Sequence, residues 1–126
     1  MSNLLDGLRI LVLEDEFLIA MDVEQLCRDY GAEDVVVARR LEEISDELEF
    51  DAAIVDLLLG GVSTFGFADR LKRLGKPFVF ASGYTDNAEV AQRFPGVAMI
   101  GKPYAGNDLV EAVAAACGRI PVSGSA

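Results

Sequence analysis

Five short apolar runs, separated by longer stretches with helical spacing, constrain the fold of this chain more than any other feature. The runs are 9–13, 35–38, 52–55, 78–81 and 97–100. Runs of this length and composition are expected of strands that are buried on both faces of a sheet. Their alternation with helices predicts an α/β domain whose parallel sheet carries helices on both faces.

The stretches between the runs show apolar residues at spacings of three and four, which predicts five helices. These stretches are 17–27, 41–48, 67–74, 87–93 and 110–117. Gly31 and Gly75 mark the ends of the first and third helices, and Ser63 and Asn107 suit N-cap positions. Gly60-Gly61 indicates a loop. Because parallel crossovers are right-handed, we expect a flavodoxin-like, doubly wound five-stranded sheet with strand order 2-1-3-4-5.

Length and charge exclude several classes of protein. A chain of 126 residues is long enough for one domain with a substantial core. Its formal charge of −10, from 21 acidic and 11 basic side chains, argues against general nucleic-acid binding, which needs a basic surface. No apolar run reaches the roughly 20 residues that cross a bilayer, and the N-terminus is not that of a signal peptide. We therefore expect a protein that binds neither nucleic acid nor membrane, and its two widely separated cysteines, Cys27 and Cys117, indicate a reducing, cytoplasmic location.

One domain is expected to span residues 1–118. Residues 119–126, which are mainly small or polar, are predicted to be a flexible C-terminal tail. Cys27 and Cys117 lie far apart in helix-like segments, and we interpret both as small buried apolar side chains rather than a disulfide or metal pair. The chain contains no histidine, which removes the commonest general base and zinc ligand.

Carboxylates stand where two neighbouring strands of the predicted sheet end. Glu14 and Asp15 follow the first apolar run, and Asp56 follows the third. Ligands of doubly wound folds bind beyond the carboxyl ends of the strands, where strand order reverses, so these side chains should converge. Clustered carboxylates repel one another, and a hard divalent cation relieves that repulsion. Mg²⁺, which prefers oxygen ligands, is the predicted cofactor.

Two further residues at strand ends suit phosphoryl transfer. Ser82 follows the fourth run and Lys102 comes shortly after the fifth. A carboxylate such as that of Asp56 can act as a nucleophile and form an aspartyl phosphate. The Lys102 ammonium can pair with one phosphoryl oxygen, and the Ser82 hydroxyl can donate a hydrogen bond to another. The sequence therefore predicts that Asp56 accepts a phosphoryl group in a Mg²⁺-dependent acidic pocket.

Four segments together resemble the response-regulator receiver domain of two-component systems. They are ILVLEDE at 10–16, AAIVDLLL at 52–59, FASGY at 80–84 and GKPY at 101–104. Each alone is a weak signal, but all four occur in order, at strand ends and with the family's spacing, and they cover nearly the whole chain. The resemblance implies a stand-alone response regulator in a phosphorelay, which is no enzyme beyond slow autophosphatase activity.

The resemblance also implies the metal ligands. Asp15 and Asp56 would bind Mg²⁺ directly, and Glu14 would act through water. The backbone carbonyl of Leu58 would be a further ligand.

The same resemblance implies roles around the phosphoryl group. Asp56 would be the phosphoacceptor, Lys102 would pair with the phosphate, and Ser82 would be the hydroxyl switch residue. Pro103 would permit the cis peptide bond that the family often has after this lysine.

Two departures from the common receiver pattern indicate a subgroup. Met99 stands where receivers usually have Tyr or Phe, and residues 57–61 lack the usual Pro-Gly. With the run 77–84, these departures resemble the subgroup named for its PFxFATGY motif, with Ser82 in place of Thr. That subgroup consists mostly of single-domain regulators, often served by sensor histidine kinases of the HWE type.

In that subgroup, switching runs through the loop after the fourth strand instead of an aromatic rotation. The resemblance therefore makes Ser82, Gly83 and Tyr84 the expected switch, with Gly83 as a hinge and Tyr84 as a mobile reporter. Since no effector segment follows residue 118, we expect the output to be contact with a downstream protein. A monomer is favoured.

Alternatives remain open at this point. The acids at 14–16 could be a solvated helix start, and Ser82 could be a turn residue only. The chain could also be a phosphorylation-independent interaction module on the same fold. A haloacid-dehalogenase-like phosphatase is a further alternative, although such enzymes need a second acid two residues after the nucleophile, where this chain has Leu58.

Overall fold

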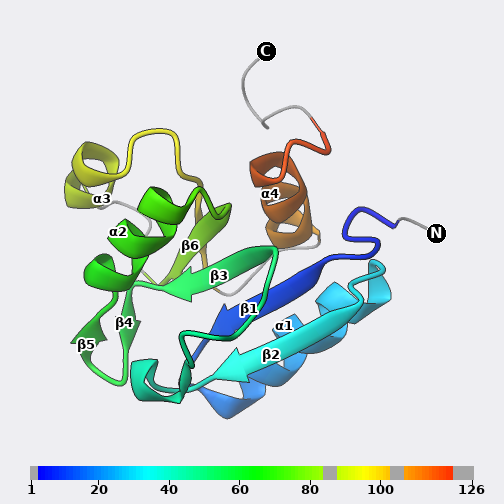
Figure 1. The fold of residues 1–126 in the computed structure, drawn as a ribbon, viewed down its shortest axis with the longest axis horizontal. Coiled ribbons are helices and arrows are strands. Elements are labelled where there is room, and N and C mark those ends of the chain that lie inside the picture. The colour runs from blue at the N-terminus through cyan, green and yellow to red at the C-terminus, as the bar shows by residue number, and fades with distance from the viewer. Residues whose placement is uncertain (1–2, 84–87, 103–106, 121–126) are drawn as a thin grey trace.

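A five-stranded parallel sheet forms the centre of the protein in the computed structural model, which describes residues 3–83, 88–102 and 107–120 (Figure 1). Its strands are β1 (Arg9–Leu13), β2 (Asp34–Ala38), β3 (Ala52–Asp56), β6 (Phe78–Ser82) and β7 (Met99–Gly101). The strands are ordered β2-β1-β3-β6-β7, and each neighbouring pair is parallel. Counted over this sheet alone, the order is the predicted 2-1-3-4-5, so the fold class is confirmed.

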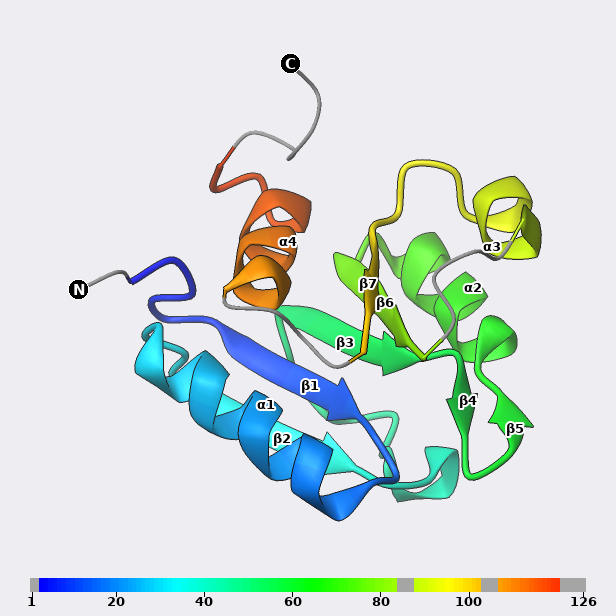
Figure 2. The same cartoon turned by 180° about the vertical axis from the view of Figure 1, so that it is seen from behind.

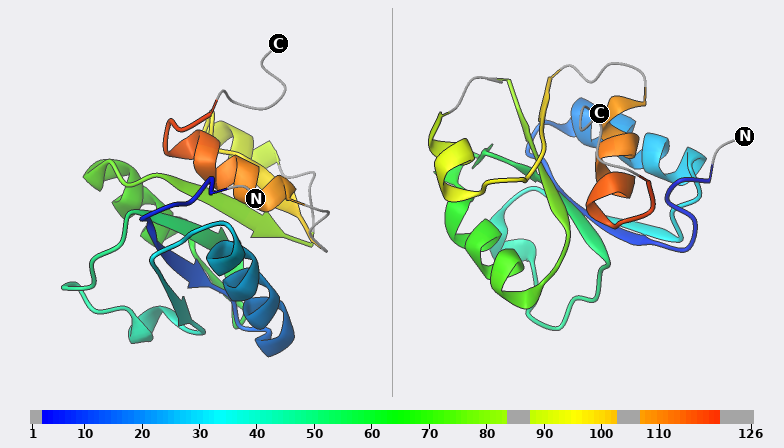
Figure 3. Two further views of the ribbon diagram at one scale, coloured as in Figure 1. Left: turned by 90° about the vertical axis from the view of Figure 1, so that its right-hand side faces the viewer. Right: turned by 90° about the horizontal axis from the view of Figure 1, so that it is seen from above.

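Helices cover both faces of the sheet, as predicted (Figures 2 and 3). On one face lie α1 (Phe17–Asp29) and α4 (Asp108–Ala116), and on the other lie α2 (Phe65–Leu74) and α3 (Ala88–Arg93). Side chains of one strand alternate between the two faces. Ile10 and Val12 of β1 accordingly pack with α1 and α4, whereas Leu11 and Leu13 pack with α2 and α3. This two-sided burial explains why the central strands β1, β3 and β6 read as continuous apolar runs, whereas the edge strand β2 leaves Val36 exposed.

Four phenylalanine rings form the centre of the core between the sheet and the helices α2 and α3. Phe80 lies 5.2 Å from Phe94, 5.4 Å from Phe78 and 6.2 Å from Phe65, measured between ring centroids. All three ring pairs meet edge to face, which is a favourable geometry for aromatic quadrupoles. The rings come from β6, from the start of α2 and from the segment after α3, so they join elements that are distant in sequence.

The second predicted helix is a single 3-10 turn, η1 (Leu41–Glu43), so within the described residues four of the five expected helices are α-helices. Leu41, Ile44 and Leu48 still pack against the core, as their spacing indicated. Residues 42–51 contain six acidic side chains and no basic one. Like charges one turn apart destabilise a helix, which is a physical reason why this segment does not continue as one.

A short hairpin follows β3 where the sequence indicated only a loop. Its strands β4 (Leu58–Leu59) and β5 (Val62–Ser63) are antiparallel and are joined by Gly60-Gly61. Both glycines have positive φ, 59° and 83°, as a two-residue hairpin turn of type I′ requires. Ser63 therefore ends a strand, and the prediction that it occupies the N-cap position of α2 was wrong, because Thr64 stands there; Oγ of Ser63 nevertheless accepts a hydrogen bond from the Phe65 amide at the start of the helix.

The predicted helix ends are largely confirmed. Gly75 ends α2 with a left-handed φ of 71°, which a glycine adopts without steric cost. Asn107 occupies the N-cap of α4, although its side chain makes no capping hydrogen bond.

Both cysteines are free. Cys27 is buried in the core, and burial raises the pKa of its thiol to about 12. Cys117 is half-buried against the same cluster, in agreement with the apolar role predicted for both.

The end of the domain is described as far as Ile120. Arg119 donates a hydrogen bond from Nη1 to the Leu4 carbonyl over 3.3 Å, and Ile120 packs against the core. Residues 121–126 lie outside the described residues, so a flexible tail over 119–126 stays a prediction. Within the part of the chain that the structure describes, no helix has both the length and the apolar character to cross a bilayer.

Candidate functional site

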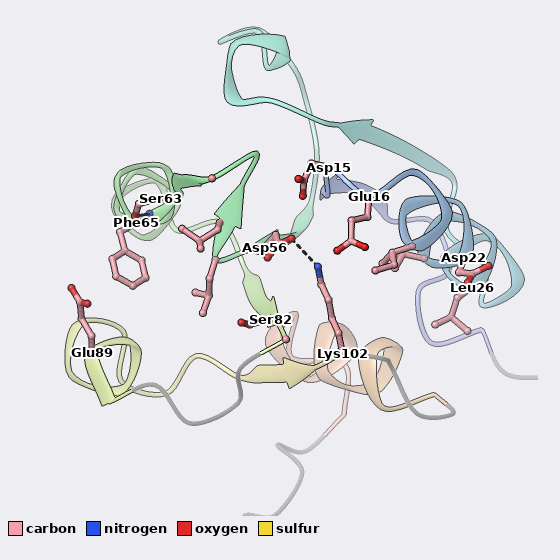
Figure 4. A pocket seen from close by; sticks show the side chains of 16 residues that line it. Asp15, Glu16, Asp22, Leu26, Asp56, Ser63, Phe65, Ser82, Glu89 and Lys102 are labelled. Atoms are coloured by element: carbon pink, nitrogen blue, oxygen red, sulfur yellow. Dashed lines mark hydrogen bonds and ion pairs between the residues drawn. The ribbon is translucent and has the colours of Figure 1, made fainter.

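The carboxyl ends of the strands bring the predicted site residues to one edge of the sheet. Glu14 and Asp15 follow β1, Asp56 is the last residue of β3, and Ser82 is the last residue of β6. Lys102 directly follows β7. Figure 4 shows Asp15, Asp56, Ser82 and Lys102 around one pocket, with the Lys102 side chain directed at Asp56. The predicted convergence of these residues is therefore observed.

Lys102 is the charged centre of this site. Its Nζ donates hydrogen bonds to Oε1 of Glu14 over 2.7 Å and to Oδ2 of Asp56 over 2.8 Å. The three side chains are only 11%, 2% and 10% exposed for Lys102, Glu14 and Asp56, respectively. Ion pairs this well shielded from water interact strongly, and losing one partner leaves a buried charge without compensation.

Burial and hydrogen bonding shift the pKa values of both Glu14 and Lys102. Burial raises the pKa of Glu14 above its ordinary value, although hydrogen bonds from Lys102 and from the Glu16 amide oppose the shift. Burial lowers the pKa of Lys102, but its hydrogen bonds to Asp56 and Glu14 outweigh that effect and raise the pKa overall. Lys102 is therefore an ammonium at neutral pH, available to an anion that replaces one of its present partners.

Three carboxylates lie close enough together to share a cation. One oxygen each from Glu14, Asp15 and Asp56 lies within 4.8 Å of the others. A donor set made only of oxygens suits a hard cation such as Mg²⁺, which also keeps several of its waters. Asp15 and Asp56 line the pocket, whereas Glu14 is buried and accepts a hydrogen bond from the Glu16 amide over 3.2 Å. These residues therefore fit the predicted magnesium site.

The site lies in a groove of about 1050 Å³ (Figure 4). In this view Asp56 and Lys102 lie in the middle, with Leu26 of α1 on one side and Phe65 of α2 on the other. Apolar side chains line much of the groove, at Ile19, Val23, Leu26, Leu57, Leu58 and Phe65, and the acidic Glu16, Asp22 and Glu89 line it as well. The site thus combines charged groups with an apolar wall that can hold a ligand or a partner side chain.

Leu58 stands two residues beyond Asp56, in β4. Its side chain lines the groove and the residue is 54% exposed. Whether its backbone carbonyl binds a metal stays a prediction.

The predicted switch segment is described only in part. Ser82 is buried and lines the groove together with Gly83. A Cβ atom added to Gly83 would meet no atom within 4 Å, so the structure shows no steric need for glycine there. Tyr84 and Pro103 lie outside the described residues, and the predictions about them stay untested.

Met99, where the sequence departs from the receiver pattern, is partly buried in the core. It is the first residue of β7, pairs with Phe80 in the sheet and packs against the cluster that contains the phenylalanine rings.

Thr64 belongs to the surroundings of the site, although the sequence did not single it out. It is fully buried, and its hydroxyl donates to the backbone carbonyl of Asp56 over 2.6 Å. The sequence indicated a cap at the neighbouring Ser63. It could not show that the Thr64 hydroxyl turns toward the strand instead of the helix.

Comparison with solved structures supports the fold. No protein-family model matches the chain, and no curated protein matches it by sequence. Solved structures that it resembles include the non-phosphorylated HemR receiver domain from Leptospira biflexa, with 23% identity, a TM-score of 0.72, and coverage of 88% of this chain and 94% of that one. The REC domain of the PhyR response regulator from Erythrobacter litoralis has 22% identity, a TM-score of 0.70 and coverage of 88% and 90%.

A response regulator receiver protein from Sinorhizobium medicae shows 21% identity, a TM-score of 0.75, and coverage of 90% of this chain and 97% of that one. The structural neighbours are thus response-regulator receiver domains, and this chain has their fold.

Proposed function

We propose that this protein is a response regulator that accepts a phosphoryl group on Asp56. The observation that carries the proposal is the cluster at one edge of the sheet, where Lys102 binds Asp56 and Glu14 while Asp15 lies within reach of both carboxylates. A buried nucleophilic carboxylate beside a fixed ammonium and a candidate cation site has the parts that phosphoryl transfer needs.

The proposed transfer is a nucleophilic substitution at phosphorus. A carboxylate oxygen of Asp56 forms the new P–O bond, and the bond from phosphorus to the imidazole nitrogen of a kinase phosphohistidine breaks. The imidazole keeps the electron pair and takes a proton from solvent. Lys102, now bound to Asp56 at 2.8 Å, can move its hydrogen bond to a phosphoryl oxygen. Ser82, which lines the same pocket, can donate another.

Asp15, Asp56 and the Leu58 carbonyl would hold Mg²⁺, with Glu14 acting through a water. The cation would offset the negative charge of the phosphoryl oxygens. Without such compensation, the acyl phosphate would place about two negative charges, one more than the carboxylate it replaces, beside two further carboxylates, and like charges at short range oppose this strongly.

The proposed role requires two protein partners, a kinase and a downstream protein. A sensor histidine kinase, of the HWE type by the resemblance to the PFxFATGY subgroup, would supply the phosphoryl group. A downstream protein would bind the phosphorylated state, with residues 82–84 as the switch. Phosphoryl transfer and this binding would both take place in the cytoplasm. The groove beside Asp56 supports this proposal because a partner side chain can reach the site through it.

Phosphorylation is tested by incubation with acetyl phosphate or phosphoramidate and Mg²⁺, followed by intact-protein mass spectrometry. We expect the mass gain of one phosphoryl group in the wild-type protein and none in Asp56→Asn, because the amide is not a nucleophile. Chelation of Mg²⁺ with EDTA should also abolish the gain. A wild-type protein that stays unmodified, or an Asp56→Asn variant that gains the same mass, would refute the proposal.

The phosphoryl group should leave Asp56 slowly. Leu58 is apolar, lines the groove and stands where a polar residue could position an attacking water. We therefore expect slow self-dephosphorylation, followed by the loss of the mass gain after the donor is removed. A half-life of seconds would contradict this. Leu58→Asn should shorten the half-life of the phosphorylated protein. The matched control Leu74→Asn, at an exposed position on α2, should leave it unchanged.

A further inference from the structure

Thr64 is a fully buried polar residue at the start of α2. Its Oγ1 lies 2.6 Å from the backbone carbonyl oxygen of Asp56 and 3.1 Å from that of Leu57. Its backbone N–H also donates to the Leu57 carbonyl, over 3.2 Å. Since a hydroxyl has a single proton, the shorter contact identifies the Asp56 carbonyl as its main acceptor.

This hydroxyl does not serve the helix that Thr64 begins. A threonine at an N-cap ordinarily accepts a hydrogen bond from an amide in the first turn, but Thr64 makes no such side-chain bond. The Phe65 amide is instead bound by Oγ of Ser63 over 3.3 Å, and the Ala68 amide donates to the backbone carbonyl of Thr64 over 2.9 Å. A plain capping role therefore does not account for the residue.

The contact between Thr64 and Asp56 lies where β3 stops pairing with β1 but still pairs with β6. Pairing of β3 with β1 ends at Val55, opposite Leu13, while pairing with β6 continues to Asp56, opposite Ala81. The chain then makes the β4–β5 hairpin and returns to Thr64, which binds the carbonyl of Asp56 eight residues back. The hydroxyl thus closes this loop at the residue whose side chain contacts Lys102.

We propose that Thr64 is a positioning residue whose hydroxyl, bound to the Asp56 carbonyl, fixes the backbone that aims the Asp56 carboxylate for phosphoryl transfer. The inference rests on the proposed function. Transfer rates depend steeply on the placement of the reacting oxygen, so a small rotation of this peptide slows the step. The hydroxyl of Thr64 contacts the backbone carbonyls of Asp56 and Leu57 and donates no hydrogen bond to the phosphoryl group, so with Mg²⁺ saturating we expect its loss to lower the transfer rate rather than donor binding.

The test compares Thr64→Val, which keeps the shape but lacks the hydroxyl, with Thr64→Ser, which keeps the hydroxyl. Phosphorylation by phosphoramidate is followed by mass spectrometry over a range of donor concentrations at saturating Mg²⁺. Thr64→Val should lower the rate constant at saturating donor by about tenfold with an unchanged half-saturation concentration, and Thr64→Ser should keep it within about twofold of wild type. Leu71→Val, a change at a buried position of α2 that does not line the groove, controls for lost stability and should leave the rate within about twofold.

The outcomes separate this inference from the function on which it rests. Equal rates for wild type and Thr64→Val, or an equal loss in Leu71→Val, would overturn the positioning role and leave Asp56 as phosphoacceptor. A wild-type protein without any mass gain would overturn both. If circular dichroism shows that Thr64→Val does not fold, Thr64→Cys provides a weaker donor of similar size, and its rate should fall below those of wild type and Thr64→Ser. A Thr64→Cys rate equal to that of wild type and Thr64→Ser would again overturn the inference.

Discussion

Replacing Lys102 with methionine should lower the free energy of unfolding by about 3–5 kcal/mol in metal-free buffer at neutral pH. The ammonium binds two carboxylates at 2.7 Å and 2.8 Å, and all three side chains are almost completely buried. Methionine has a similar length but no charge, so Glu14 and Asp56 would be left facing each other without compensation. Urea denaturation in the presence of EDTA measures the loss.

The loss should depend on pH in a defined direction. Lys102 opposes the burial that raises the pKa of Glu14, so without it that pKa in the folded state would rise further above its unfolded value. The folded variant would then bind more protons than the unfolded chain, and its stability would fall as pH rises through this interval. We therefore expect a smaller deficit near about pH 5 than near about pH 8.

Magnesium should restore part of the lost stability in the same variant. A divalent cation bound by Asp15 and Asp56 would compensate the charge that Lys102 normally balances, and binding to the folded state alone stabilises it by mass action. Lys72→Met, an exposed lysine on α2, is the matched control and should change stability by less than about 0.5 kcal/mol. A Lys102→Met variant as stable as wild type in EDTA would contradict the central charge role of Lys102.

Replacing Phe80 with alanine should destabilise the fold by about 3–5 kcal/mol. The ring is fully buried and meets Phe65, Phe78 and Phe94 edge to face at 5.2–6.2 Å between centroids. The substitution removes the buried area, these ring contacts and the packing between β6 and the helices α2 and α3.

Chemical denaturation again provides the measurement for Phe80. Phe17→Ala is the control, because Phe17 is 59% exposed at the start of α1 and its loss leaves no buried cavity. We expect the control to cost less than about 1 kcal/mol. A Phe80→Ala variant that loses no more than this control would show that the four rings do not form the centre of the core.

The sequence predicted much of the fold and of the site for a simple reason. A strand buried on both faces needs apolar residues at every position, so β1, β3 and β6 are visible as continuous runs. Parallel strands place their carboxyl ends at one edge, and the convergence of Asp15, Asp56 and Lys102 follows from their positions after such runs.

Local stretches without such strong signals were predicted less well. The Leu41–Leu48 stretch has helical spacing, but its dense negative charge leaves only the turn η1. Gly60-Gly61 indicated a loop, and the hairpin that it joins is only two residues long on each side, too short for a periodic signal.

The sequence by itself determined the class of the fold, its strand order and the polar residues at the carboxyl edge of the sheet, because apolar periodicity and strand ends are properties of the chain alone. Only the tertiary structure decided which groups make contact: Lys102 with both Glu14 and Asp56, the four phenylalanine rings with one another, and the Thr64 hydroxyl with the Asp56 carbonyl. Hydrogen bonds and ring packing depend on distances of a few ångströms between residues far apart in the chain, and such distances exist only once the elements are packed.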